Sequence, residues 1–196
     1  MAGSYVFHLL QQGLLFRCNG IVECCRLFHQ CNDLLFLLCI LRHTHYQFIH
    51  FSQHKESLDF IYSFIDFSMK RHLDDSHRFF KLDRMRRMMD LLGNPQDNFL
   101  SIHVAGTKGK GSTASLCASG LRAAGYKTGL YTSPHLQEFT ERIQIDGEQI
   151  SRQALVDLVA RIRPFTQQVP DITTFELMTA LAFLYFQESQ VNIAVV

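Results

Sequence analysis

A glycine-rich loop near the middle of the chain is the feature of the sequence with the clearest chemistry. Its eight residues, Gly106-Thr-Lys-Gly-Lys-Gly-Ser-Thr113, follow a short apolar stretch and precede a run of small residues. Glycines let the backbone turn tightly and direct its N–H groups towards an anion. The pattern therefore predicts a phosphate-binding loop between a strand at 102–105 and a helix that begins near Ser112.

The polar side chains of this loop can complete a nucleotide site. Lys110 can reach the β- and γ-phosphates as a point charge, and the hydroxyl of Ser112 or Thr113 can lie beside a metal ion. Lys108 is either a second phosphate contact or a solvated loop residue. The loop departs from the usual pattern G-x-x-x-x-G-K-[ST], because Val104 replaces its first glycine and an extra glycine follows the lysine.

Composition divides the chain into two unlike pieces. The 196 residues are 47% hydrophobic and 19% charged, with a formal net charge of +1, which gives no reason to expect a nucleic-acid partner. Five of the six cysteines and six of the ten histidines fall within residues 1–55. These cysteines and histidines lack the paired spacing of a zinc site. We expect residues 1–55 to be an atypical extension that is not part of the fold.

The sequence from residue 57 onward predicts alternating helices and strands. The apolar spacing predicts helices at 57–68, 82–92, 114–124, 151–162 and 175–186, and strands at 102–105, 128–132, 142–145, 148–150 and 191–196. Asp146-Gly147 suits a two-residue hairpin turn, Ser151 is a plausible N-cap, and Pro164 and Pro170 indicate a loop. This alternation predicts an α/β fold with a largely parallel sheet flanked by helices.

Several motifs, in order along the chain, resemble one family. Residues 102–113 resemble the nucleotide loop of the folylpolyglutamate synthases and bifunctional dihydrofolate synthases, which are relatives of the Mur peptide ligases. The other matching motifs are Leu82-Asp-Arg-Met85 with Leu92-Gly-Asn-Pro95, Tyr131-Thr-Ser-Pro-His-Leu136, Glu141-Arg-Ile143 and Thr174-Phe-Glu176. The resemblance covers residues 57–196 and implies the N-terminal part of a P-loop-containing, Mur-ligase-like ATP-binding domain, incomplete and without its C-terminal domain.

The resemblance also implies roles for single residues. The residues that it implies for ATP binding are Gly106, Thr107, Lys108, Gly109, Lys110, Gly111, Ser112 and Thr113, of which Lys110 is also catalytic. It implies Ser133 as a magnesium ligand, and it implies a folate-binding set of Leu82, Thr173, Thr174, Phe175 and Glu176. On spacing alone, Ser133 can instead begin a Ser-Pro turn, and Glu176 can cap the following helix. We expect His135 to form hydrogen bonds within its loop.

The implied activity is an ATP-dependent and Mg²⁺-dependent ligase of folate biosynthesis and one-carbon metabolism. It would add L-glutamate to tetrahydrofolate, or to dihydropteroate in dihydrofolate synthesis, through an acyl phosphate. The alternatives are a Mur-type ligase acting on a cell-wall precursor and a nucleotide-binding protein without catalysis. Because the family pattern continues beyond Val196, we expect an N-terminal fragment with little ligase activity. We expect a cytoplasmic protein, monomeric when complete, without nucleic-acid or membrane partners.

Overall fold

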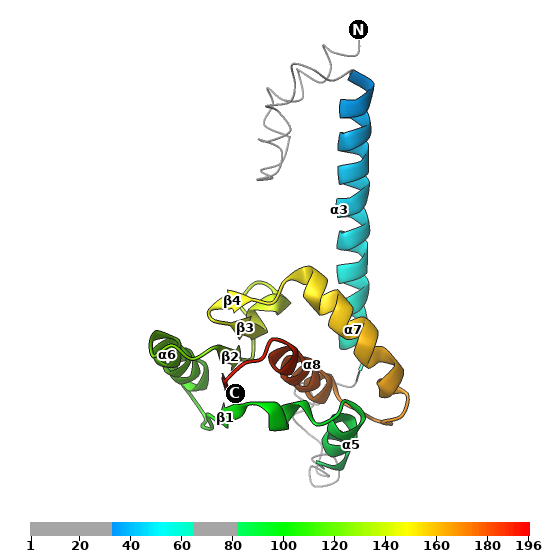
Figure 1. Cartoon of the computed structure of the whole chain (residues 1–196). Coiled ribbons are helices and arrows are strands. Elements are labelled where there is room, and N and C mark those ends of the chain that lie inside the picture. The colour runs from blue at the N-terminus through cyan, green and yellow to red at the C-terminus, as the bar shows by residue number, and fades with distance from the viewer. Residues whose placement is uncertain (1–32, 65–81) are drawn as a thin grey trace. The chain divides into compact units, whose positions relative to one another are not determined.

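The computed structural model describes residues 33–64 and 82–196 (Figure 1). The chain divides into two compact units, Met1–Phe48 and Ile49–Val196. Helix α3 (Asp33–Tyr62) begins in the first unit and ends in the second. The predicted start of this helix at Ser57 is therefore wrong, and residues 65–68 of that predicted helix lie outside the described residues. Across the described ranges, no helix is long and apolar enough to cross a membrane.

The second unit is an α/β domain built on a mixed sheet. Its further elements are α5 (Asp83–Leu91), η2 (Pro95–Asn98), β1 (Leu100–Ile102), α6 (Lys110–Ala123), β2 (Thr128–Tyr131), η3 (Phe139–Arg142), β3 (Ile143–Ile145), β4 (Glu148–Gln149), α7 (Arg152–Thr166), α8 (Thr174–Glu188) and β5 (Ile193–Val195). The strands pair in the order β1-β5-β2-β3-β4. The first three are parallel, and the β3–β4 hairpin adds two antiparallel strands. The predicted fold class is confirmed.

Helix α6 covers one face of the sheet, and α8 covers the other with α5 and α7 packed against it (Figure 1). Successive residues of β2 alternate between these faces. Leu130 packs with Ala114 of α6 and Val195 of β5. Gly129 faces α8, where an added Cβ would lie 2.9 Å from the ring of Phe186. Glycine at this position therefore lets α8 pack closely on the sheet.

The larger hydrophobic core lies on the α8 side of the sheet. Ile61 of α3, Met88 of α5, Ile143 of β3 and Leu155 of α7 are all completely buried in it. Full burial of one such side chain contributes roughly 1.5–3 kcal/mol. The last turns of α3 are therefore an integral part of the second unit.

Local turn and cap signals are confirmed in part. Asp146 and Gly147 have φ angles of 52° and 85°, as the predicted hairpin requires. The Ser151 side chain accepts a hydrogen bond from the Ala154 N–H at 3.1 Å and so caps α7. Pro164 lies inside α7, which ends at Thr166, so the predicted end of this helix at Ile162 and the placement of Pro164 in a loop are wrong. Proline has no N–H to donate to the carbonyl four residues before it, and α7 continues for two residues beyond Pro164 without that hydrogen bond.

Candidate functional site

The carboxyl ends of the three parallel strands meet at one edge of the sheet. Val195 of β5 is opposite both Ile102 of β1 and Leu130 of β2. Neighbouring strands lie roughly 4.8 Å apart, so the loops that follow β1 and β2 begin roughly 10 Å from each other. Ligands of open α/β sheets bind outside the carboxyl ends of the strands. This edge is therefore the candidate site.

The loop after β1 is open and leads directly into helix α6. The Val104 N–H donates to the Val196 carbonyl at 2.7 Å, so backbone pairing continues beyond the end of β1. Residues 105–113 are all exposed. Gly109 is the N-cap residue of α6 and has a φ angle of 75°, in the left-handed region that favours glycine. Helix α6 therefore begins at Lys110, two residues before the position near Ser112 that the sequence predicts.

The first turn of α6 offers hydrogen-bond donors to a ligand. The N-cap residue Gly109 has no side chain that could cap the helix. The first hydrogen bond of the helix runs from the Thr113 N–H to the Gly109 carbonyl, at 3.0 Å. Helix geometry gives the N–H groups of Lys110, Gly111 and Ser112 no acceptor within the helix. No acidic residue lies in this turn. These N–H groups and the positive end of the helix dipole can together bind an anion.

Lys110 adds a positive charge to these backbone donors. Its Nζ donates a hydrogen bond to the Gly106 carbonyl at 2.6 Å, which holds the ammonium group against the glycine loop. The residues predicted to bind ATP, Gly106 to Thr113, are all exposed in this loop or in the first turn of α6. The structure therefore brings the whole predicted set together.

The loop after β2 contains Ser133 and is held by a buried arginine. Ser133 itself is exposed, whereas Arg142 is only 9% exposed. Arg142 Nη1 donates to Ser133 Oγ at 3.0 Å, and Arg142 Nε donates to His135 Nδ1 at 2.8 Å. His135 thus forms a hydrogen bond within its loop, as expected. The role of Arg142 was not predicted, and its only signal in the sequence was its place in the Glu141-Arg-Ile143 motif.

Glu141 holds the backbone of the same loop. Its carboxylate accepts hydrogen bonds from the N–H groups of Leu136 at 2.6 Å, Gln137 at 2.9 Å and Glu138 at 2.8 Å. The bonds from the Glu138 and Leu136 amides lower the pKa of Glu141, with smaller contributions from Gln137 and the nearby His135. Residues 133–138 are therefore held both through their side chains and through their backbone.

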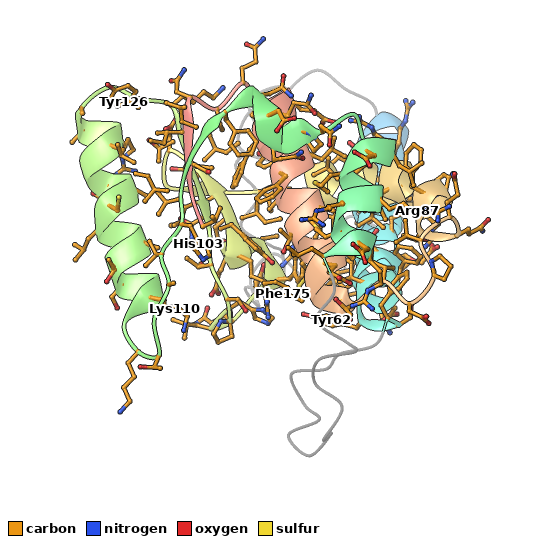
Figure 2. The ribbon with its side chains drawn as sticks, turned by 90° about the horizontal axis from the view of Figure 1, so that it is seen from below. Tyr62, Arg87, His103, Lys110, Tyr126 and Phe175 are labelled. Atoms are coloured by element: carbon orange, nitrogen blue, oxygen red, sulfur yellow. The ribbon has the colours of Figure 1, made fainter. Side chains whose placement is uncertain are left out.

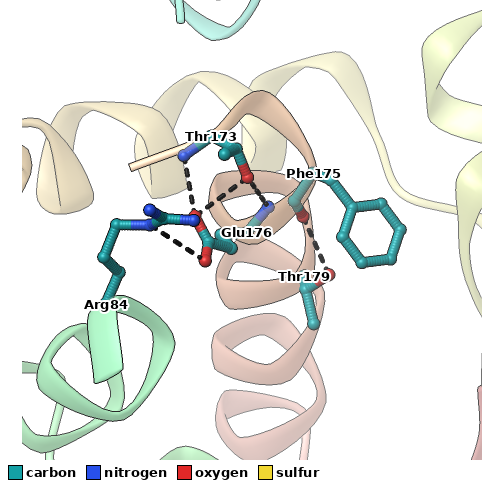
Figure 3. Close-up of polar contacts among 5 residues, drawn as sticks. All are labelled: Arg84, Thr173, Phe175, Glu176 and Thr179. Carbon is teal, nitrogen blue, oxygen red and sulfur yellow. Dashed lines mark hydrogen bonds and ion pairs between the residues drawn. The ribbon is translucent and has the colours of Figure 1, made fainter. Parts of the chain in front are cut away.

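The first turn of α8 lies towards the same end of the domain as Lys110 (Figure 2), and side chains cap two N–H groups at its start (Figure 3). Thr173 and Glu176 form a capping box, in which the Glu176 carboxylate accepts from the Thr173 N–H at 2.8 Å. Arg84 of α5 donates to the same carboxylate, with Nε 3.2 Å and 3.3 Å from its two oxygens. Glu176 therefore caps its helix, which was one of the two roles considered from the sequence.

The residues predicted to bind folate differ in exposure. Thr173 and Thr174 are 8% and 2% exposed, and Thr174 Oγ1 donates to the Phe64 carbonyl at 2.9 Å. Leu82 and Phe175 are 64% and 59% exposed. Phe175 and Lys110 lie towards one end of the domain, whereas Tyr126 lies at the other end (Figure 2). Of the two exposed apolar residues, Phe175 thus lies towards the same end of the domain as the glycine loop.

The fold and the loop define a P-loop-containing domain of the Mur-ligase type. The chain is 46% identical over 119 residues to the folylpolyglutamate synthase of Lacticaseibacillus casei, across 58% of this chain and 28% of that protein. It is 43% identical over 112 residues to the dihydrofolate synthase/folylpolyglutamate synthase of Bacillus subtilis, across 55% of this chain and 26% of that protein. No protein-family model matches the chain.

Solved structures give the same result. An FPGS–AMPPCP–folate complex superposes with a TM-score of 0.63 at 40% identity, across 73% of this chain and 34% of that one. The chain is therefore a homologue of the folylpolyglutamate and dihydrofolate synthases, as its motifs indicated. It spans about a quarter to a third of the length of these relatives.

Proposed function

We propose that the loop 106–113 binds the phosphate groups of ATP. The observation that carries this proposal is the uncapped first turn of α6, which places free N–H groups and Lys110 at the carboxyl edge of the sheet. Charge-assisted hydrogen bonds to phosphate oxygens are strong, and a helix N-terminus favours negative charge. A homologous structure contains the ATP analogue AMPPCP, which supports ATP as the nucleotide.

We also propose that Mg²⁺ binds together with this nucleotide. The candidate protein ligands are hydroxyl oxygens, from Ser133 and from Ser112 or Thr113, and magnesium prefers oxygen ligands. In residues 33–64 and 82–196, no group of three or more His, Cys, Asp and Glu side chains could hold a metal ion. These donors fit an ion that takes most of its ligands from phosphates and water. When bound, Mg²⁺ would neutralise charge on the phosphates.

The reaction that we propose is the ligation of L-glutamate to a folate. A substrate carboxylate attacks the γ-phosphorus of ATP and releases ADP, and the amine of glutamate then displaces phosphate from the acyl phosphate. In this chain, Lys110 and the first-turn amides would hold and stabilise the phosphoryl charge. The names of the homologues favour this activity over a ligase acting on a cell-wall precursor. Both tetrahydrofolate and dihydropteroate remain open as acceptors.

Lys110→Ala tests the phosphate site. We expect the affinity of the chain for AMPPCP with Mg²⁺ to fall by at least about tenfold, because a hydrogen bond to a charged group is lost. Isothermal titration calorimetry measures this change. Lys127→Ala is the matched control, because Lys127 is an exposed lysine that lies beyond the other end of α6. Equal affinities of the Lys110→Ala variant and the wild-type chain would overturn the proposal.

Phe175→Ala tests whether the exposed aromatic residue at the start of α8 contacts the pterin ring. Loss of one stacked ring should weaken folate binding by about tenfold, measured by fluorescence titration. Tyr126→Ala is the control, because Tyr126 is also an aromatic residue, 53% exposed, at the opposite end of the domain (Figure 2). If both variants bind folate as the wild type does, Phe175 has no part in the site.

A further inference from the structure

We propose that Arg142 is a positioning residue, which orients the Ser133 hydroxyl towards the metal ion that accompanies the nucleotide. This inference rests on the proposed function of the carboxyl edge. The side chain of Arg142 is buried beneath the loop after β2, so it does not contact a ligand directly. Its effect must therefore pass through the residues that it contacts.

The backbone of Arg142 is fixed by the sheet. The Thr132 N–H donates to the Arg142 carbonyl at 2.9 Å, immediately beyond the pairing of Tyr131 with Ile143. Arg142 is thus in register with the first residue after β2. From this fixed position its side chain donates to Ser133 and His135. The position of the loop is therefore set relative to the sheet.

The two hydrogen bonds of the guanidinium group set the orientation of the loop. Arg142 Nη1 and Nε donate to Ser133 Oγ and His135 Nδ1 at 3.0 Å and 2.8 Å. A serine oxygen has two acceptor lone pairs. Arg142 occupies one of them and so holds the oxygen atom in place, and the second lone pair remains available to a metal ion. The rigid, planar fork of arginine suits this task, whereas a lysine has a single point charge.

The charge of Arg142 is poorly compensated for a buried group. Among the described residues, no carboxylate lies within ion-pair distance of it, and its acceptors are a neutral hydroxyl and an imidazole. Its other close neighbour is the Phe139 ring, whose centroid is 5.8 Å from Cζ. A buried charge without a counter-ion destabilises a fold, so stability alone does not explain this arrangement.

Glu141 and Arg142 hold different parts of the loop after β2. Glu141 holds only backbone N–H groups, those of residues 136–138, whereas its neighbour Arg142 holds the two side chains nearer to β2. The loop would keep its path through Glu141 if Arg142 were replaced. A substitution at Arg142 can therefore change the orientation of Ser133 without removing the loop.

The test is the gain in AMPPCP affinity that Mg²⁺ provides, measured by calorimetry in MgCl₂ and in EDTA on the full chain. For Arg142→Gln we expect this gain to fall by about tenfold, the value of one hydrogen bond to a charged group, with affinity in EDTA within about twofold of wild type. Ser133→Ala should show the same loss, and the double variant no greater loss, because both residues act through one contact. A merely structural role would lower both affinities.

Two further variants separate geometry from charge. Arg142→Lys keeps the positive charge but loses the fork, so we expect it to resemble Arg142→Gln. It also fills the same space, and it carries the test alone if Arg142→Gln does not fold. Arg122→Gln is the matched control, because Arg122 lies in the last turn of α6 and donates to the Asp146 carbonyl of the hairpin at 2.6 Å. Its Mg²⁺-dependent gain should equal that of the wild type.

The possible results distinguish the inference from the proposed function. If the wild-type chain does not bind AMPPCP, or gains nothing from Mg²⁺, the proposed function fails and the inference fails with it. If the wild type shows the gain and folded Arg142→Gln keeps it, only the role of Arg142 is overturned. Restoration by Arg142→Lys, or additive losses in the double variant, would also overturn the positioning role.

Discussion

Two helices begin at the same edge of the sheet, and their first turns are built in opposite ways. In α8, Thr173 Oγ accepts from the Glu176 N–H at 3.1 Å, and the Glu176 carboxylate accepts from the Thr173 N–H at 2.8 Å. Arg84 then pairs with that carboxylate at 3.2 Å. In α6, the N-cap residue is Gly109, which provides no side-chain cap.

The difference between the two helix starts indicates that the cap of α8 contributes to stability, whereas the open start of α6 contributes to ligand binding. A side-chain cap stabilises a helix by about 1 kcal/mol, so α6 lacks a stabilising interaction that α8 has. The chain thus satisfies the Thr173 and Glu176 N–H groups at the start of α8 with side chains, and it provides no such side-chain cap for the first turn of α6. If this division is correct, changes at Gly109 should alter nucleotide affinity, and changes at Glu176 should alter stability.

The largest effect should come from giving α6 a negatively charged N-cap residue. In Gly109→Asp, the carboxylate would compete with phosphate for the first-turn N–H groups and repel its charge, so we expect AMPPCP affinity to fall by about a hundredfold or more. Calorimetry in the presence of Mg²⁺ measures the change.

Gly109→Ala is the control for strain in the backbone. Both variants place a Cβ at a left-handed residue, and no atom within 4 Å obstructs it. The alanine variant carries no charge, so its loss of affinity should be at least about tenfold smaller than that of the aspartate variant. Equal losses would show that backbone strain, and not competition for the donors, weakens binding.

A smaller effect, on stability, is expected when the cap of α8 is removed. Glu176→Ala breaks the capping box and leaves the half-buried Arg84 without this partner, so the free energy of unfolding should fall by about 2 kcal/mol. Urea unfolding measures it. The affinity for AMPPCP should not change, and a loss comparable to that of Gly109→Asp would contradict the division between the two helices.

Glu188→Ala is the matched control at the other end of α8. Glu188 pairs with Arg161, and the two side chains are 37% and 57% exposed. An exposed pair contributes less than about 1 kcal/mol, so this variant should unfold at nearly the wild-type urea concentration.

The smallest effect concerns pH and the end of α3, which joins the same core. Burial lowers the pKa of His54 below 6.5, the nearby Arg152 lowers the pKa further, and Glu138 opposes this. His54 Nδ1 also has no hydrogen-bond partner in the part of the chain that the structure describes. The folded protein therefore takes up a proton at His54 less readily than the unfolded chain does.

The free energy of unfolding should consequently fall as the pH drops below 6.5, by at most about 1.4 kcal/mol per pH unit. Denaturation at pH 7.5 and pH 5.5 measures this slope, in a range where ordinary carboxylates stay ionised. His54→Gln should flatten it. An unchanged slope in the variant would assign the pH dependence to other groups.

Sequence patterns predicted the parts of the site whose conformation is set by residues close to them in the sequence. The glycine loop and the Asp146-Gly147 turn are of this kind, because positive φ angles select their residues locally. A capping role for Glu176 was one of the two roles predicted for it, and the capping box with Thr173 has the S/T-x-x-E spacing of that motif. The start of α6 was misplaced because left-handed Gly109, and not Ser112, ends the loop.

Contacts between distant residues could not be predicted in this way. Arg84 and Glu176 are 92 residues apart, and they meet only because α5 packs against α8. Arg142 reaches Ser133 because β2 and β3 pair in one particular register. The long extent of α3 was missed because residues before Ser57 lack a clear helical pattern, whereas Ile61 near its end is buried by tertiary packing.

The most direct test of the central claim is amide NMR of the ¹⁵N-labelled chain, titrated with AMPPCP in the presence of Mg²⁺. Binding at the first turn of α6 predicts that the largest shifts occur at the N–H groups of Lys110, Gly111 and Ser112, which have no acceptor within the helix. The capped N–H groups at the start of α8, those of Thr173 and Glu176, should shift much less. Equal or larger shifts at α8, or no shifts at α6, would contradict the account.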